Sequence, residues 1–296
     1  MFKQIIVAVD GSPTSNRGLK AAIGLASDQR ATLSIVHVIN DVASISYFGD
    51  MGYVPADYVD TLLDDLRRNG QKVLARAAAT AKAGGVTAKT TLVETKGGSI
   101  ADAILAQVRK VHADVIVMGT HGRRGLDRLV TGSTTESILR KSQSPVLAVH
   151  EPTRSFVSPE SADEPVHLRK ILCCVDFSEH SPRALEYAFS LGMQYQAEIT
   201  LLNVLEDGKD TSEQKDRDAA SMEQLIPEDA RNWASITPLV LSGQPYEQII
   251  EHAAEAQTDL IVMGVRGRNA VDLAVFGSTT HRVIQLGPCP VLVVRA

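Results

Sequence analysis

The stretch Asp114-Val-Ile-Val-Met-Gly-Thr-His-Gly122 runs from an apolar, β-branched segment into a pair of glycines, and after nine further residues the chain reads Gly132-Ser-Thr134. A second copy reads Asp259-Leu-Ile-Val-Met-Gly-Val-Arg-Gly267 and, again after nine residues, Gly277-Ser-Thr279. The copies lie 145 positions apart, since 264 − 119 and 277 − 132 both equal 145. This constancy indicates an internal duplication with no insertion inside the motif.

Flanking segments recur in the same order in both halves. Apolar runs predict strands, and stretches of roughly ten to fifteen residues between them predict helices. Strands alternating with helices build right-handed βαβ units and a parallel sheet. We therefore expect an α/β protein of two tandem, doubly wound, five-stranded parallel-sheet domains. The paired strands are 4–9 with 170–175, 32–38 with 198–204, 87–93 with 236–241 and 145–149 with 290–294; the paired helices are 15–28 with the segment that ends at 195, and 99–111 with 246–256.

Length and composition set the domain boundaries. With 296 residues, 44% of them hydrophobic, the chain can form two cores. Residues 151–168 carry three prolines among serines and acidic residues, so we interpret them as a linker, too polar and too broken for a core element. The predicted domains are residues 1–150 and 169–296.

The second half is shorter in its middle. The first strands end at Asp10 and Asp176, 166 positions apart, so the second half lacks 166 − 145 = 21 residues before its glycine motif. The first half carries an aromatic stretch at 44–60 in this region. Two interpretations of it stay open: a loop packed on its own domain, and a flap or contact surface.

Charge and hydropathy exclude several classes of partner. The net charge of −5 and the pI near 5.9 disfavour a nucleic-acid partner, which requires a basic face. No apolar run reaches the roughly 18 residues of a membrane-spanning helix, and the N-terminus lacks a secretion-signal layout. We therefore expect a cytoplasmic protein with no membrane partner. Cys173, Cys174 and Cys289 have no disulfide or zinc-site spacing, and we expect them to be small buried hydrophobes.

The glycine motif suits phosphate. Gly119 and Gly122 allow close approach and positive φ at the strand end. Gly132, Ser133 and Thr134 then begin a helix, where unpaired N–H groups and the positive end of the helix dipole favour an anion. The hydroxyl groups can add contacts. The second copy repeats the arrangement with Gly264, Gly267, Gly277, Ser278 and Thr279.

The same residues allow a structural interpretation, in which the glycines make a tight turn and Ser133 to Glu136 form a capping box. Two copies with identical spacing favour phosphate binding instead. In the second copy His281 replaces Glu136, and a first-turn histidine is poorly matched to a helix N-terminus. Two interpretations of His281 stay open. In one, a bound polyphosphate removes the mismatch; in the other, the histidine is exposed to solvent and binds no ligand.

A carboxylate follows the first strand of each half. Asp10 and Asp176 face the carboxyl edge of the sheet, where ligands bind in open α/β folds. There a carboxylate can accept hydrogen bonds from ribose hydroxyls or hold a metal through water. The alternative role is a helix N-cap, and both roles can coexist.

Familiar catalytic patterns are missing from the sequence. It has no P-loop, no Gly-x-Gly-x-x-Gly after the first strand, and no His-Glu-x-x-His. His121, beside the first glycine loop, is the one candidate acid or base. Arg266 lies near that position in the second half, which argues against a shared catalytic histidine.

At these residues the chain resembles the universal stress protein family, in particular its tandem-domain members. The family's nucleotide motif, Gly-x2-Gly-x9-Gly-[Ser/Thr], is complete in both halves, and the resemblance covers all but the linker and the aromatic stretch. It implies a Rossmann-like, adenine nucleotide alpha hydrolase-like fold that binds ATP, with or without Mg²⁺. It also implies domain pairing through the closing strands, here as an internal pseudo-dimer, with a homodimer of chains as a further expectation.

The resemblance implies roles for further residues. The aspartate after the first strand is associated with the adenosine end of ATP, which assigns Asp10 and Asp176. The residue after the histidine of the second strand contacts adenine through its backbone, which assigns Val38 and, with Asn203 in place of the histidine, Val204. Met118 and Met263, directly before the glycine loops, are expected to line the pockets.

Two functions of different class follow from the resemblance. We expect a nucleotide-responsive regulator of the stress response that binds one ATP per domain and is not an enzyme. The alternative is an enzyme that slowly hydrolyses ATP or phosphorylates itself, and a scaffold with degenerate pockets is disfavoured because both motifs are intact. The halves differ at Glu136 and His281, at His37 and Asn203 and in their middle segments, so we expect two sites of unequal affinity.

Overall fold

The computed structural model of the chain describes residues 1–40, 56–95, 97–120, 132–150, 154–157, 166–206, 211–265 and 277–295. Its strands are β1 (Gln4–Ala8), β2 (Thr32–Ile39), β3 (Ala88–Glu94), β4 (Val115–Gly119), β5 (Val146–Val149), β6 (Lys170–Cys174), β7 (Glu198–Leu205), β8 (Ile236–Ser242), β9 (Leu260–Gly264) and β10 (Val291–Val294). Its helices are α1 (Pro13–Gln29), α3 (Ala56–Ala83), α4 (Ile100–Val111), α5 (Ser133–Lys141), α6 (Ser181–Tyr195), α7 (Ser212–Gln224), the 3₁₀ helix η1 (Glu228–Asn232), α8 (Pro245–Glu255) and α9 (Ser278–Leu286).

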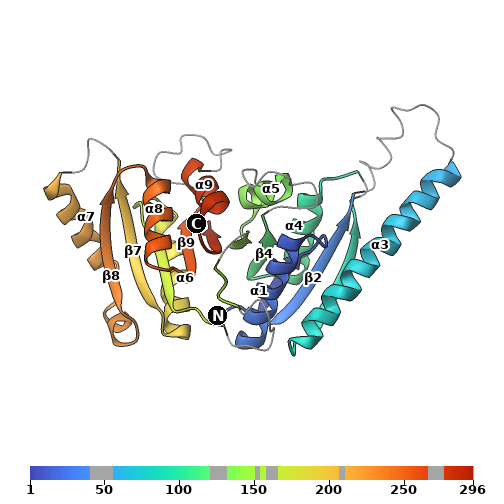
Figure 1. The fold of residues 1–296 in the computed structure, drawn as a ribbon, viewed down its shortest axis with the longest axis horizontal. Helices are drawn as coiled ribbons and strands as arrows, with labels where there is room; N and C mark the ends of the chain where they lie inside the picture. The colour runs from blue at the N-terminus through green and yellow to red at the C-terminus, as the bar shows by residue number, and fades with distance from the viewer. Residues whose placement is uncertain are drawn as a thin grey trace.

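The strands form one ten-stranded sheet in the order β3-β2-β1-β4-β5-β10-β9-β6-β7-β8 (Figure 1). Within each half, neighbouring strands pair in parallel. β5 and β10 join the halves as an antiparallel pair in which Leu147 lies opposite Leu292. These leucines are equivalent positions of the duplication, since 292 − 147 = 145, so a pseudo-twofold axis passes between them. The predicted tandem parallel sheets and the pairing of their closing strands are confirmed.

Helices cover both faces of the sheet. α1, α3, α6 and α7 pack on one face, and α4, α5, α8 and α9 pack on the other (Figure 1). The strands alternate accordingly: Ile5 and Val7 contribute to the first core, Ile6 contributes to the second, and all three are buried. Burial on both faces explains the nearly continuous apolar runs of the central strands. Within the described ranges, no helix is both long and apolar enough to cross a membrane.

The segment interpreted as a linker contributes to the core. Phe156, Val157, Val166 and Leu168 are all buried in the cluster shared by α1 and α6. Gly24 of α1 makes room for them, because a Cβ at that position would lie 2.8 Å from a methyl group of Val157. The description of this segment as too polar for a core element was therefore wrong: its few apolar residues are the ones that pack.

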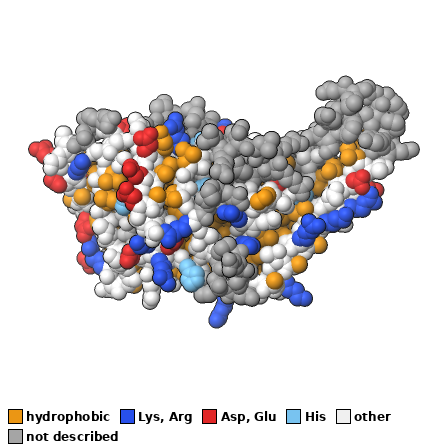
Figure 2. Space-filling view, in the orientation of Figure 1, with side chains coloured by type: hydrophobic (Ala, Val, Ile, Leu, Met, Phe, Trp, Pro, Cys, Tyr) orange, Lys and Arg blue, Asp and Glu red, His pale blue; other side chains and the backbone are white. Residues whose placement is uncertain are grey.

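Helix α3 was not anticipated from the sequence. It has 28 residues, about 42 Å at 1.5 Å per residue, and it begins at Ala56, so residues 56–60 belong to a helix and not to the predicted loop. Residues 44–55 of that stretch lie outside the described residues. Exposed basic side chains follow the helix (Figure 2), among them Arg68, Lys72 and Arg76.

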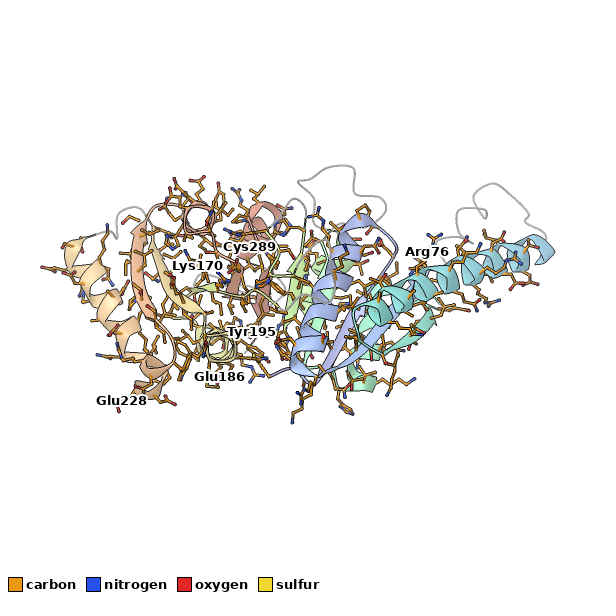
Figure 3. All side chains as sticks on the ribbon, turned by 60° about the horizontal axis from the view of Figure 1, so that its bottom comes forward. Arg76, Lys170, Glu186, Tyr195, Glu228 and Cys289 are labelled. Atoms are coloured by element: carbon orange, nitrogen blue, oxygen red, sulfur yellow. The ribbon has the colours of Figure 1, made fainter. Side chains whose placement is uncertain are left out.

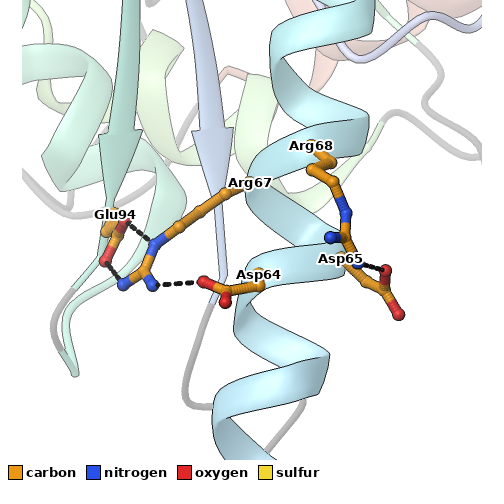
Figure 4. A network of polar contacts seen from close by, with 5 residues as sticks. All are labelled: Asp64, Asp65, Arg67, Arg68 and Glu94. Carbon is orange, nitrogen blue, oxygen red and sulfur yellow. Dashed lines mark hydrogen bonds and ion pairs between the residues drawn. The ribbon is translucent and has the colours of Figure 1, made fainter.

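An arginine fork fastens α3 to the edge of the sheet. Arg67 donates from Nε and Nη2 to the two carboxylate oxygens of Glu94 in β3, at 2.8 and 3.1 Å, and from Nη1 to Asp64 at 3.0 Å (Figure 4). In the second half the equivalent connection carries α7, which has 13 residues. The difference, 28 − 13 = 15 residues, accounts for most of the predicted shortening.

Candidate functional site

The predicted site residues meet at the carboxyl edge of the sheet. Ala8 of β1 pairs with Val36 of β2 on one side and with Met118 of β4 on the other. Asp10, Val38 and Gly119 follow these positions within two residues along each strand, so the register brings them to one edge. The second half repeats the arrangement with Asp176, Val204, Met263 and Gly264.

The aspartates organise the turn that precedes a helix. Asp10 Oδ1 accepts a hydrogen bond from Ser12 N at 2.8 Å, and Asp10 N donates to Ser15 Oγ at 3.4 Å. The N-cap of α1 is Ser12, whose Oγ accepts from Ser15 N at 3.2 Å. The N-cap role considered for Asp10 is therefore wrong. The carboxylate instead holds the turn at the edge of the sheet.

Asp176 repeats this geometry in the second half. Its Oδ1 accepts from Ser178 N at 3.0 Å and from Ser181 Oγ at 2.7 Å, and the N-cap of α6 is His180. The residues after the two aspartates both have positive φ: 81° at Gly11 and 58° at Phe177. A bulky side chain is rarely found in this conformation, so the turn keeps its shape despite the backbone strain that Phe177 adds.

His37 and Asn203 make the same hydrogen bond. His37 Nδ1 donates to Val9 O at 2.7 Å, and Asn203 Nδ2 donates to Val175 O at 2.7 Å. Both bonds join the second strand of a half to the end of its first strand. Asn203 is buried, and its Oδ1 has no hydrogen-bond partner among the described residues. The replacement of histidine by asparagine therefore preserves the contact between the strand ends. It also leaves one buried amide oxygen, Oδ1 of Asn203, as an acceptor without a described donor.

Gly119 is required by a close contact between backbones. A Cβ at this position would lie 2.7 Å from Thr14 C and from Ser15 N in the first turn of α1. Gly119 does not have positive φ, and the N-cap glycines Gly132 and Gly277 have φ of −59° and −58°. The positive φ expected at Gly119 is therefore wrong, and glycine is needed there because the backbone of α1 lies against it.

The ends of each glycine loop meet at its base. Thr120 N donates to Val149 O at 2.9 Å, and Gly132 N donates to Thr120 O at 2.7 Å. The equivalent bonds in the second half run from Val265 N to Val294 O at 2.8 Å and from Gly277 N to Val265 O at 3.3 Å. Gly122, Gly267, His121 and Arg266 lie outside the described residues.

Two buried threonines fix the helices that follow these loops. Thr135 Oγ1 donates to Gly119 O at 3.1 Å, and Thr280 Oγ1 donates to Gly264 O at 3.0 Å. Each bond holds the first turn of α5 or α9 against the end of the neighbouring strand. Sequence reasoning missed both residues, although their spacing of 145 and their place in the repeated Gly-Ser-Thr-Thr run were visible.

Among the residues that the structure describes, no side chain caps the N-terminus of α5 or of α9. Their N-cap residues are Gly132 and Gly277, so Ser133 is the first helical residue and cannot close a capping box. Glu136 instead forms an ion pair with Arg140 one turn later. The capping-box interpretation is therefore wrong. The first turn of each helix lies at the edge of the sheet where the predicted residues gather, because Thr135 and Thr280 bind the carbonyl groups of Gly119 and Gly264 there. The first N–H groups of a helix have no acceptor within the helix.

His281 is neither fully exposed nor buried. Its Nε2 lies 3.4 Å from Nε2 of Gln285, one turn further along α9. The side chain therefore contacts its own helix.

Partly buried apolar side chains line the same edge on the face covered by α4 and α8. In the first half they include Ala8, Val38, Val93 and Ile100. In the second half the partly buried apolar side chains on that face include Cys174, Val204, Leu241 and Tyr246. The guanidinium carbon of Arg282 lies 4.3 Å from the centre of the Tyr246 ring.

Two of the three cysteines are buried as predicted. Burial raises the pKa of Cys173 and of Cys289 to about 12. Cys174, which lies where the first half has Ala8, is less completely buried than predicted, although burial still raises the pKa of its thiol well above the usual range.

A separate cavity of about 230 Å³ lies at the opposite, amino edge of the sheet. Lys141, Ser144 and the C-terminal turn of α4 line it. None of the sequence-predicted site residues contributes to this cavity, and the duplicated geometry lies at the other edge.

Known proteins match the two halves of the chain separately and as a pair. The sequence profile of the Universal stress protein family matches residues 1–150 and 167–295. This chain belongs to the universal stress protein family. Universal stress protein YxiE of Bacillus subtilis is 35% identical over 150 residues, which are 50% of this chain and 99% of that protein.

Tandem relatives span the whole length. A universal stress protein of Mycolicibacterium smegmatis is 26% identical over 311 residues, covering 98% of this chain and 96% of that protein. The crystal structure of a universal stress protein from Archaeoglobus fulgidus aligns over 99% of this chain and 98% of that one, with a TM-score of 0.73 and 24% identity. That structure supports the fold of this universal stress protein.

Proposed function

We propose that each half of this universal stress protein binds one adenine nucleotide, ATP with or without Mg²⁺, at the carboxyl edge of its sheet. The observation that carries the proposal is the helix start that both halves share. The N-cap residues of α5 and α9 are glycines, which have no side chain to cap the helix, and Thr135 and Thr280 hold the first turns against strand ends. Unpaired N–H groups and the positive dipole end of a helix favour the phosphates of a nucleotide.

The remaining parts of the edge fit the rest of the ligand. Val38 and Val204 present apolar surface suited to a base, and Asp10 and Asp176 place carboxylates that can accept hydrogen bonds from ribose hydroxyls. Ser133, Ser278, Thr134 and Thr279 add hydroxyl groups in the first helical turns. Gly122 and Gly267 complete the proposed sites from sequence alone.

Occupancy would then act as a regulatory input. A ligand shifts a conformational or assembly equilibrium only by its differential affinity for the two states, so the proposed response to stress requires a second state that binds ATP differently. The closing strands β5 and β10 already pair with each other, so a homodimer of chains, which we also propose, must use another surface.

Equilibrium dialysis with purified protein and radiolabelled ATP, with and without Mg²⁺, tests the proposal. We expect two nucleotides per chain. Ser133→Glu should remove the first site and Ser278→Glu the second, because a carboxylate at an uncapped helix start repels phosphate. Ser212→Glu is the matched control: it adds the same charge at the first residue of α7, whose N-terminus is already capped by Thr211. A stoichiometry near zero for the wild type refutes the proposal.

The alternative function is slow ATP hydrolysis or autophosphorylation at the same sites. His121, beside the first loop, motivates it as the one candidate acid or base near the motif. Phosphate release above a heat-treated control that is lost in His121→Gln would favour this alternative over a regulator that only binds ATP.

A further inference from the structure

A residue of the first half reaches across the pseudo-twofold axis to the second. Val149, at the end of β5, accepts the hydrogen bond from Thr120 that closes the base of the first glycine loop. The next residue, His150, is 1% exposed, and its Nε2 donates to Gly287 O at 2.5 Å. Gly287 is the C-cap of α9, the helix whose N-terminus belongs to the second site.

The second half returns the same contact. Val294, at the end of β10, accepts from Val265 at the base of the second glycine loop. The next residue, Arg295, donates from Nη2 to Arg140 O in the last turn of α5, the helix of the first site. His150 and Arg295 are equivalent positions, since 295 − 150 = 145. The two donors are thus related by the pseudo-twofold axis, and their acceptors, Gly287 O and Arg140 O, lie near the C-terminal ends of equivalent helices.

Each short helix is consequently held at both ends by different halves. α5 and α9 have nine residues each. Thr135 and Thr280 fix their first turns to strands of the same half, whereas the last turns accept hydrogen bonds from the other half. The last carbonyl groups of a helix carry the negative end of its dipole, so an arginine or a histidine N–H donor is well suited to that position.

We propose that His150 and Arg295 are positioning residues, each of which sets the phosphate-binding helix of the opposite half and so couples the two nucleotide sites. The inference rests on the proposed function. Movement of α9 on binding would act through His150 on the strand end that closes the first glycine loop, and movement of α5 would act through Arg295 in the same way. Such coupling between two ligands must be reciprocal in their binding affinities.

Variants that keep only one nucleotide site test whether each residue acts on the site of the opposite half. In Ser133→Glu only the second site remains, and in Ser278→Glu only the first. We combine each background with His150→Phe and with Arg295→Met, which remove the donor and keep much of the volume. His150→Gln and Arg295→Lys, which keep an N–H donor, serve as rescue variants. ATP affinity is then measured by titration calorimetry.

We expect His150→Phe to weaken the second site by about two- to tenfold, the range that corresponds to one hydrogen bond, and to leave the first site nearly unchanged. Arg295→Met should do the reverse, and the rescue variants should restore most of the affinity. The matched control is Tyr195→Phe, which removes the 3.2 Å hydrogen bond from Gln29 across the same two halves but on the face of α1 and α6 (Figure 3). It should change neither site.

Three results would overturn the inference: each substitution weakening the site of its own half, both sites weakening equally, or neither site responding. Hydrogen exchange separates this outcome from a failure of the proposed function, because it needs no nucleotide. His150→Phe should speed exchange in the last turn of α9 and Arg295→Met in that of α5. Equal changes in both helices, or none, refute the positioning role even if the protein binds no ATP.

Discussion

Replacing Thr135 by valine tests whether the start of α5 is held in place for a ligand. Valine matches threonine in shape, and the side chain is 3% exposed, so packing should be conserved. The change removes the 3.1 Å hydrogen bond to Gly119 O, which ties the first helical turn to the end of β4. A hydrogen bond of this kind contributes about 1 kcal/mol net, more when its partner stays buried and unpaired.

Two effects should follow from the same loss. If the fixed first turn is what positions the N–H groups for phosphate, ATP affinity at the first site should fall by about fivefold, the ratio equivalent to about 1 kcal/mol. The melting temperature should fall by about 2–4 °C. Calorimetric titration in the Ser278→Glu background measures the affinity of the first site alone, and Thr280→Val in the Ser133→Glu background is the matched experiment for the second.

The comparison of ATP affinity with melting temperature decides whether Thr135 shapes the proposed site. A lower melting temperature with unchanged affinity at the first site would refute the reasoning, because Thr135 would then support the fold without shaping the site. An equal loss at both sites would also contradict it, since Thr135 contacts the strand of its own half.

Three further predictions concern positions where the halves can be compared. Gly119→Ala should destabilise the protein by about 1–3 kcal/mol in urea unfolding, because its Cβ would meet the α1 backbone at 2.7 Å; an unchanged midpoint would contradict the close contact. His37→Asn should change the free energy of unfolding by less than about 1 kcal/mol in the same assay, because the amide can donate to Val9 O as Asn203 donates to Val175 O and position 37 is only half-buried; a larger loss would contradict the equivalence of the two donors. Maleimide should label Cys174 faster than Cys173 in the native protein because Cys174 is the more exposed of the two, and bound ATP should slow the labelling of Cys174. Mass spectrometry of the labelled peptides measures both rates, and no effect of ATP would show that Cys174 does not line the second site.

The duplication made most of the fold predictable. The recurrence identified equivalent strands, the alternation of strands and helices predicted that they are parallel, and the resemblance to universal stress proteins implied the pairing of the closing strands. Helix α3 was missed although Gly70, Leu74, Ala77 and Ala81 recur at helical spacing and are buried.

The errors at the site share a physical cause. A Ser-x-x-Glu run predicts a capping box only if the serine is the N-cap, and that depends on where the preceding loop delivers the chain. Here Gly132 is the N-cap, so Ser133 and each later residue lie one position further into the helix than a capping box requires. In the same way, the sequence cannot distinguish a glycine needed for positive φ from one needed because another backbone lies against it, as at Gly119.

The two halves keep an N–H donor at equivalent positions although the side chains differ. The same strand carbonyl accepts from a histidine in one half and from an asparagine in the other, and the same helix end accepts from His150 or from Arg295. The backbone arrangement around the glycine motif therefore tolerates a change of side chain so long as an N–H donor remains.

The differences that should matter for affinity lie beside the two proposed sites. Tyr246 replaces Ala101 and carries the guanidinium of Arg282 over its ring, where the first half has Ser137. These substitutions add an aromatic face and a cation beside the second helix start. Unequal affinity, if titration finds it, should thus be reduced by Tyr246→Ala together with Arg282→Ser, whereas exchanging His37 and Asn203 should leave it unchanged.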